Sequence, residues 1–139
     1  MSMSGDDRAA RIAAEARALI GCPFRLHGRS AALGVDCVGL AAIAYGRAGH
    51  EGMAPAGYAL RTGDVARVEA ALGQAGLRRV EKGRTGDLVL ARPGPLQLHL
   101  MIRVPGGFVH AHAGLRQVVE TPGKVPWPII SEWRAIWEG

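Results

Sequence analysis

The chain is poor in aromatic residues and cysteines and has no long apolar run, and each shortage excludes a class of protein. Phe, Trp and Tyr make up 5% of the 139 residues, which leaves no aromatic stripe for stacking bases. Two cysteines are too few for a disulfide framework. No segment reaches the roughly eighteen apolar residues of a membrane-spanning helix. Residues 1–11 lack the basic start and apolar stretch of a signal peptide.

The charge balance is basic, with a formal net charge of +5 and a pI of about 10. A basic surface favours anionic partners such as nucleic acid, anionic lipid or an acidic cell-wall polymer. The arginines are scattered and form no run of five, so we expect no nucleic-acid partner. A chain of this length with 48% hydrophobic residues predicts a single domain, residues 1–139, with its own core.

Helices are predicted in the first half of the chain. The first covers residues 6–20, with Asp6 or Asp7 as its cap. The second begins near Cys37 and ends near Gly49.

Residues 50–61 look like a loop that precedes a third helix. Thr62 or Asp64 can cap this helix, and Gly76 closes it. Beyond Gly76 the apolar period changes to two, which is typical of strands. The predicted strands are residues 77–80, 88–91, 98–104, 108–113 and 117–120, with residues 129–137 as a strand that covers an edge. Helices followed by an antiparallel β-meander give the α+β class.

Residues 36–40, with the sequence DCVGL, are the most informative segment because they place a thiol where a loop becomes a helix. Unpaired N–H groups and the helix dipole at that position favour the thiolate of Cys37, which is the nucleophilic form. The alternative is that Cys37 is a small buried residue of the core with no chemical role. As a nucleophile Cys37 must stay free, and Cys22 is then expected to be a loop or core thiol; a disulfide between Cys22 and Cys37 is the alternative.

Matching apolar faces predicts a hairpin between residues 98–104 and 108–113 that turns at Pro105-Gly106. Ile102 then lies opposite Val109, and the same register continues to both strand ends.

This register places three of the five histidines on one face of the hairpin, with His112 opposite His99 and His110 opposite Met101. A one-residue slip would separate them. His27 and His50 are expected to be solvated loop residues. The combination of Cys37 with a histidine cluster indicates a thiol hydrolase.

Five segments resemble, in order and spacing, the successive motifs of NlpC-type cysteine peptidases, a family of bacterial cell-wall endopeptidases. They are residues 23–25 (PFR), 34–40 (GVDCVGL), 86–90 (GDLVL), 99–102 (HLMI) and 108–111 (FVHA). The resemblance covers about residues 8–120. It implies a papain-like α+β fold and hydrolysis of an amide bond in a peptidoglycan stem peptide that involves D-glutamate and a diamino acid. Thiolate chemistry needs no metal or cofactor, so none is expected.

Residue by residue, the resemblance implies that Cys37 is the nucleophile, His99 the general base and His110 the residue that orients His99. The reaction would be acyl transfer, with the backbone N–H of Cys37 as a donor to the oxyanion. The register leaves His112 as a rival to His110 for the orienting role.

The chain departs from the family at Phe24, where the family usually has a Tyr whose hydroxyl faces the site. Arg25 and His27 are candidate replacement donors. Asp36 is expected either to bind the substrate amine or to cap the helix. The predicted substrate-binding residues are therefore Phe24, Arg25, Asp36 and His112.

Residues 110–133 look most like the phage-tail and gene-transfer-agent branch of the family. That resemblance implies tail-tip partner proteins and synthesis in the cytoplasm, with a phage-like particle delivering the enzyme to the cell wall.

Two other functions remain open from the sequence alone. His99, His110 and His112, with Cys37 nearby, are suited to a zinc-binding hydrolase. The loss of the hydroxyl at Phe24 is also consistent with a structural tail-tip protein whose peptidase site has decayed.

Overall fold

In the computed structural model, which describes residues 4–52 and 57–137, the cap of the N-terminal helix lies two or three residues before the predicted cap at Asp6 or Asp7. Helix α1 (Gly5–Ala18) is capped by Ser4, whose hydroxyl accepts the Asp7 N–H at 3.1 Å while the Asp7 carboxylate accepts the Ser4 N–H. The predicted cap at Asp6 or Asp7 was wrong because Asp7 acts as the second half of a capping box.

Helices α2 (Cys37–Arg47) and α4 (Val65–Gln74) begin where their caps predicted. Asp36 caps α2 and Asp64 caps α4. A further helix, α3 (Gly57–Thr62), lies where the sequence suggested a loop. Six residues are too few to show a helical period, and burial of Ala59 and Leu60 against the core stabilises this short helix. The remainder of that predicted loop includes residues 53–56, which lie outside the described residues.

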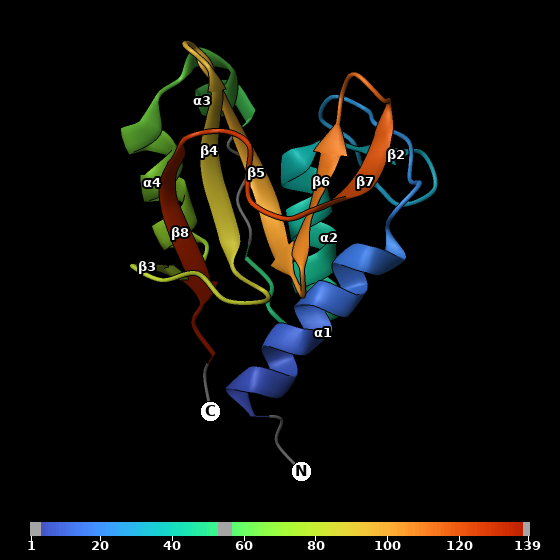
Figure 1. The fold of residues 1–139 in the computed structure, drawn as a ribbon, viewed down its shortest axis with the longest axis vertical. Coiled ribbons are helices and arrows are strands. Elements are labelled where there is room, and N and C mark those ends of the chain that lie inside the picture. The colour runs from blue at the N-terminus through green and yellow to red at the C-terminus, as the bar shows by residue number, and fades with distance from the viewer. Residues whose placement is uncertain (1–3, 53–56, 138–139) are drawn as a thin grey trace.

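Six strands form an antiparallel sheet in the order β3-β8-β4-β5-β6-β7 (Figure 1). Their bounds are β3 (Leu77–Val80), β4 (Leu88–Gly94), β5 (Gln97–Val104), β6 (Gly107–His112), β7 (Gln117–Pro122) and β8 (Ile129–Ala135). A two-stranded ribbon of β1 (Arg29–Ser30) and β2 (Gly34–Val35), which the sequence did not predict, lies in the loop before α2. Strands β4 to β7 form the predicted meander. As predicted, strand β8 covers the free edge of β4. Strand β3 pairs with the other side of β8, so β8 is an internal strand of the sheet.

The predicted β5–β6 register is confirmed near the turn and fails beyond it. Ile102 pairs with Val109, but no described pair continues toward His99. Figure 1 shows the two strands diverging away from their shared turn. His112 therefore does not lie directly opposite His99. Helix α2 packs on both strands.

The two faces of the sheet are covered differently. The helices and the apolar face of β5 form the main core. On the other face, Val89, Ala91, Met101 and Phe108 form a small cluster against Val125 and Trp127. Figure 1 shows the segment between β7 and β8 crossing this face of the sheet. Among the described helices, none is long and apolar enough to cross a membrane.

His50 is buried, so the expectation that it is a solvated loop residue was wrong. It is 7% exposed, and its ring lies between Tyr45 and Trp137 with Nε2 3.1 Å from the Gly76 carbonyl oxygen. Cys22 is a free, buried thiol, so the alternative disulfide to Cys37 is not formed.

Candidate active site

Cys37 is the first residue of α2, and Asp36 joins this helix to the loop in front of it. One carboxylate oxygen of Asp36 accepts the Gly39 N–H at 2.9 Å and the Arg29 guanidinium at 2.8 Å. The other oxygen accepts the His27 N–H at 2.8 Å. Asp36 is 5% exposed. Its bonds reach both the loop and the first turn of α2, so they hold the loop against the start of the helix. Capping is therefore a role that Asp36 performs, and binding of a substrate amine stays a prediction.

Gly39 is the position in the DCVGL segment where only glycine fits. A Cβ atom there would clash with the carbonyl oxygen of Gly28, in the same loop that Asp36 holds. The backbone of α2 thus lies directly against this loop, and a side chain at Gly39 would displace the loop or tilt the helix that carries Cys37.

A chain of hydrogen bonds begins at His99 on β5. His99 Nε2 lies 2.9 Å from His110 Nδ1 on β6, and His110 Nε2 lies 3.2 Å from the Thr121 hydroxyl on β7. His110 is 2% exposed. The structure therefore brings His110, and not His112, into contact with His99. His112 Nδ1 instead accepts the backbone N–H of Leu115 at 3.0 Å.

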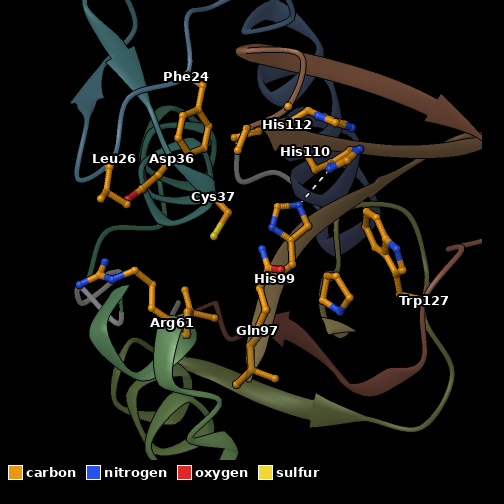
Figure 2. A pocket seen from close by; sticks show the side chains of 16 residues that line it. Phe24, Leu26, Asp36, Cys37, Arg61, Gln97, His99, His110, His112 and Trp127 are labelled. Atoms are coloured by element: carbon orange, nitrogen blue, oxygen red, sulfur yellow. Dashed lines mark hydrogen bonds between the residues drawn. The ribbon is translucent and has the colours of Figure 1, made fainter. Parts of the chain in front are cut away.

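These bonds determine which ring nitrogen of His99 is available for chemistry. Figure 2 shows the His99 ring between Cys37 and His110, with the sulfur on the side away from the His110 bond. If His99 Nδ1 accepts the thiol proton, the neutral ring carries hydrogen on Nε2 and donates it to His110 Nδ1. His110 then carries hydrogen on Nε2 and donates it to Thr121. A single set of tautomers satisfies the chain.

Burial sets the protonation states of the resting site. Burial raises the pKa of the Cys37 thiol to about 11; the Asp36 charge adds to this rise, and the backbone N–H groups of Leu100, Val38 and Cys37 oppose it. Burial also lowers the pKa of His99 to about 3, helped by His110 and His112. The pKa of His110 falls to about 4 for the same reason, with a contribution from His112. For the pKa of Cys37, the effect of desolvation is thus larger than the effect of the helix N-terminus. A neutral thiol therefore faces a neutral imidazole.

Cys37 and His99 line a cavity of about 390 Å³, a size typical of small-ligand sites. Among the predicted substrate-binding residues, Phe24, Asp36 and His112 also line it (Figure 2). Arg25 does not line it and has an exposed side chain. His27 is also exposed and outside the lining, so neither candidate replacement for the missing hydroxyl at Phe24 reaches the cavity wall.

Sequence reasoning missed several residues of this site. The Trp127 ring packs edge-on against His99 and His110, with centroid separations of 5.8 and 5.9 Å. Its Pro-rich segment gave no periodic signal that would place it there. Thr121 was detectable, since it continues the β7 alternation on the face of His110, but the predicted strand ended at Glu120. Arg61 and Gln97 also line the cavity.

The zinc alternative requires the histidines to point at one ion. His99 and His110 instead direct ring nitrogens at each other, and the second nitrogen of His110 is directed at Thr121. Within the described ranges, no group of three or more His, Cys, Asp or Glu side chains is arranged to hold a metal ion. The geometry is that of a hydrogen-bonded base beside a thiol.

Comparison with known proteins gives matches at the level of structure. No protein-family model and no curated protein matches the sequence. NlpC1 from Trichomonas vaginalis is 25% identical, with 99% of this chain and 47% of that chain covered and a TM-score of 0.72. The peptidoglycan hydrolase RipB from Mycobacterium tuberculosis is 21% identical, with coverages of 97% and 67% and a TM-score of 0.67. The NlpC/p60 domain of the peptidoglycan hydrolase SagA is 25% identical, with coverages of 82% and 88% and a TM-score of 0.59.

The chain spans about half the length of the two T. vaginalis proteins it matches, 47% of NlpC1 and 50% of NlpC2. The predicted α+β class is confirmed, and the chain has the papain-like fold of these NlpC/P60 structures.

Proposed function

We propose that this chain is a cysteine peptidase that hydrolyses amide bonds in the stem peptides of peptidoglycan. The observation that carries the proposal is the meeting of Cys37, at the start of α2, with the hydrogen-bonded pair of His99 and His110 in one cavity. The fold supports it, because solved structures that share it include two proteins described as peptidoglycan hydrolases.

The mechanism follows from the protonation states of the site. Because thiol and imidazole are both neutral at rest, His99 Nδ1 takes the thiol proton as the sulfur attacks the peptide carbonyl. The resulting imidazolium donates through Nε2 to His110, which holds the ring in position.

Collapse of the tetrahedral intermediate completes the first half of the reaction. The N–H of Cys37 at the helix start is a donor for the oxyanion. The proton on His99 passes to the leaving amine as the C–N bond breaks, which leaves an acyl group on the sulfur. Water, activated by the same imidazole, then releases the acid and restores the thiol.

Hydrolysis of purified peptidoglycan fragments tests this function directly. Wild-type protein should release a new amine and a new carboxyl group from soluble stem peptides, detected by mass spectrometry, and Cys37→Ala should release none. Cys22→Ser is the matched control for a change of thiol, since Cys22 lies outside the cavity lining. Folded wild-type protein that cleaves no peptide would point to a decayed scaffold. Activity lost to a chelator and restored by zinc would favour the metal alternative.

We also propose that the enzyme acts as part of a phage-like tail, in contact with tail-tip proteins. Support for this setting comes only from the resemblance of residues 110–133 to that branch of the family. Sedimentation of particles from producing cells tests it. Co-migration of the chain with tail proteins, and its loss from particles that lack the tail tip, are the expected results. A chain found only outside particles would reject this setting and leave the proposed chemistry untouched.

A further inference from the structure

Arg61 carries the one fixed positive charge in the described lining of the cavity. It follows two buried residues of α3, Ala59 and Leu60, which are 3% and 4% exposed and hold the helix on the core. Gly63, just past the helix, lies against the backbone of Leu96 in the turn between β4 and β5. The arginine therefore extends from an anchored helix. Figure 2 shows its side chain along the wall opposite Phe24, with Cys37 between them.

The guanidinium of Arg61 has no acceptor in the part of the chain that the structure describes. No carboxylate there lies within ion-pair distance of it, and no hydrogen bond satisfies its five donors. The carboxylate of Asp36 in the lining, by contrast, is already ion-paired with Arg29 at 2.8 Å. The cavity thus presents one unpaired cation to whatever enters it.

The surroundings of Arg61 favour a carboxylate as its ligand. Much of the lining is apolar, including Phe24, Leu60, Leu98 and Trp127. Ion pairs are stronger beside apolar walls than in open water. The planar guanidinium matches a carboxylate with two parallel hydrogen bonds.

We propose that Arg61 is a specificity-determining residue that binds a free carboxylate of the peptide substrate, so that the enzyme selects acidic peptides over their amidated forms. The inference rests on the proposed peptidase function, because it places this carboxylate in the same cavity as the bond that is cut. A stem peptide offers two such groups: the α-carboxylate that a γ-linked glutamyl residue leaves free, and the C-terminal carboxylate.

Three matched peptides distinguish these groups: the free acid, its glutamyl α-carboxamide and its C-terminal carboxamide. Binding is measured by calorimetry in the Cys37→Ala background, where no turnover occurs, and kcat/KM is measured with Cys37 intact. The free acid should bind roughly tenfold or more tighter than one of the two amides, which identifies the carboxylate. Arg61→Gln should reduce that preference to near one, and Arg61→Lys should retain part of it.

Arg78→Gln is the control, because Arg78 is an exposed arginine on β3 that does not line the cavity. It should leave the preference intact. Equal binding of all three peptides to Cys37→Ala, no binding of any of them, or an unchanged preference in Arg61→Gln would overturn the proposal. Cleavage of all three peptides at equal rates would overturn it while the peptidase function stands. Binding with an Arg61-dependent preference but no cleavage would support this inference and reject the peptidase function.

Discussion

His99 Nε2 lies 2.9 Å from His110 Nδ1, although no ladder pair of β5 with β6 is formed at either residue. The two strands separate beyond Ile102, and the imidazoles span the gap between them. This bond occupies the nitrogen of His99 that faces away from Cys37 and leaves Nδ1 for the thiol (Figure 2). The separation of the strands is thus what gives His110, and not His112, the orienting position.

The three histidines of the hairpin should differ in their importance for hydrolysis. His99→Ala should be as inactive as Cys37→Ala, because the His99 ring is the base placed between the sulfur and His110 (Figure 2). His110→Ala should be strongly impaired yet measurable, since an orienting residue takes no proton itself. His112→Ala should be milder still. Single-turnover hydrolysis of a soluble stem peptide measures all three.

Each histidine variant needs a check of folding by circular dichroism, because the His110 ring also packs on Phe108 and Trp127. A greater loss in His112→Ala than in folded His110→Ala would reverse the roles assigned to these two residues.

Thr121 should act through His110. Thr121→Val removes the hydroxyl that lies 3.2 Å from His110 Nε2 while keeping the shape of the side chain. We expect a loss of several-fold in single-turnover rate, of the order of one neutral hydrogen bond. Thr121→Ser, which keeps the hydroxyl, should restore most of the rate.

A double variant separates a positioning role of Thr121 from a structural one. In the His110→Ala background, Thr121→Val should have little further effect on the rate, because the residue it positions is absent. Full additivity of the two losses would contradict the hydrogen-bonded chain.

Cys37 should be the only thiol that hydrolysis requires. Cys37→Ser should lose essentially all activity. Cys22→Ser should keep most of it, because the Cys22 sulfur contacts the Ala31 carbonyl oxygen in the loop before α2 and does not line the cavity. Initial rates on the same peptide, at matched concentrations of folded protein, measure both. A Cys37→Ser enzyme with undiminished turnover would end the cysteine-peptidase hypothesis.

The sequence predicted the features that depend on local chemistry, such as a helix cap, and those that depend on the alternation of side chains between the two faces of a strand. The cap at Asp36 placed the start of α2. Alternation along β5 and β6 predicted that the three histidines share one face, and in the structure all three line the same cavity. Alternation states which face a residue occupies, but not where pairing between two strands ends. The predicted opposition of His112 to His99 failed for that reason, and the motif resemblance identified His110 where the register alone did not.

The parts of the site that the sequence did not predict depend on tertiary packing. Trp127 reaches the histidines from an irregular segment without a period, where its position depends on the apolar cluster beneath it. Helix α3 is too short for a helical signal, and through it the sequence also missed Arg61. The internal position of β8 results from β3, a strand far away in the chain that pairs with its outer side.

The pH dependence of the site should show that thiolate is formed during attack and is not present beforehand. A pKa of about 11 for Cys37 means that the free thiolate fraction is small at neutral pH and grows about tenfold for each pH unit up to that value. Alkylation of Cys37 by iodoacetamide in the Cys22→Ser background should rise in that way between pH 7 and 10.

The lowered pKa of His99, about 3, determines how the activity depends on pH below neutrality. A pKa below the ordinary value of about 6.5 keeps the imidazole unprotonated, and therefore able to accept a proton, as the pH falls through 6.5. Between pH 5 and 8, kcat/KM should consequently show no acid limb from protonation of the base. Alkylation that stays fast and level from pH 6 to 8, together with an acid limb near 6.5 in kcat/KM, would instead establish a thiolate–imidazolium pair in the resting enzyme. In that case the helix N-terminus would lower the pKa of Cys37 by more than burial raises it.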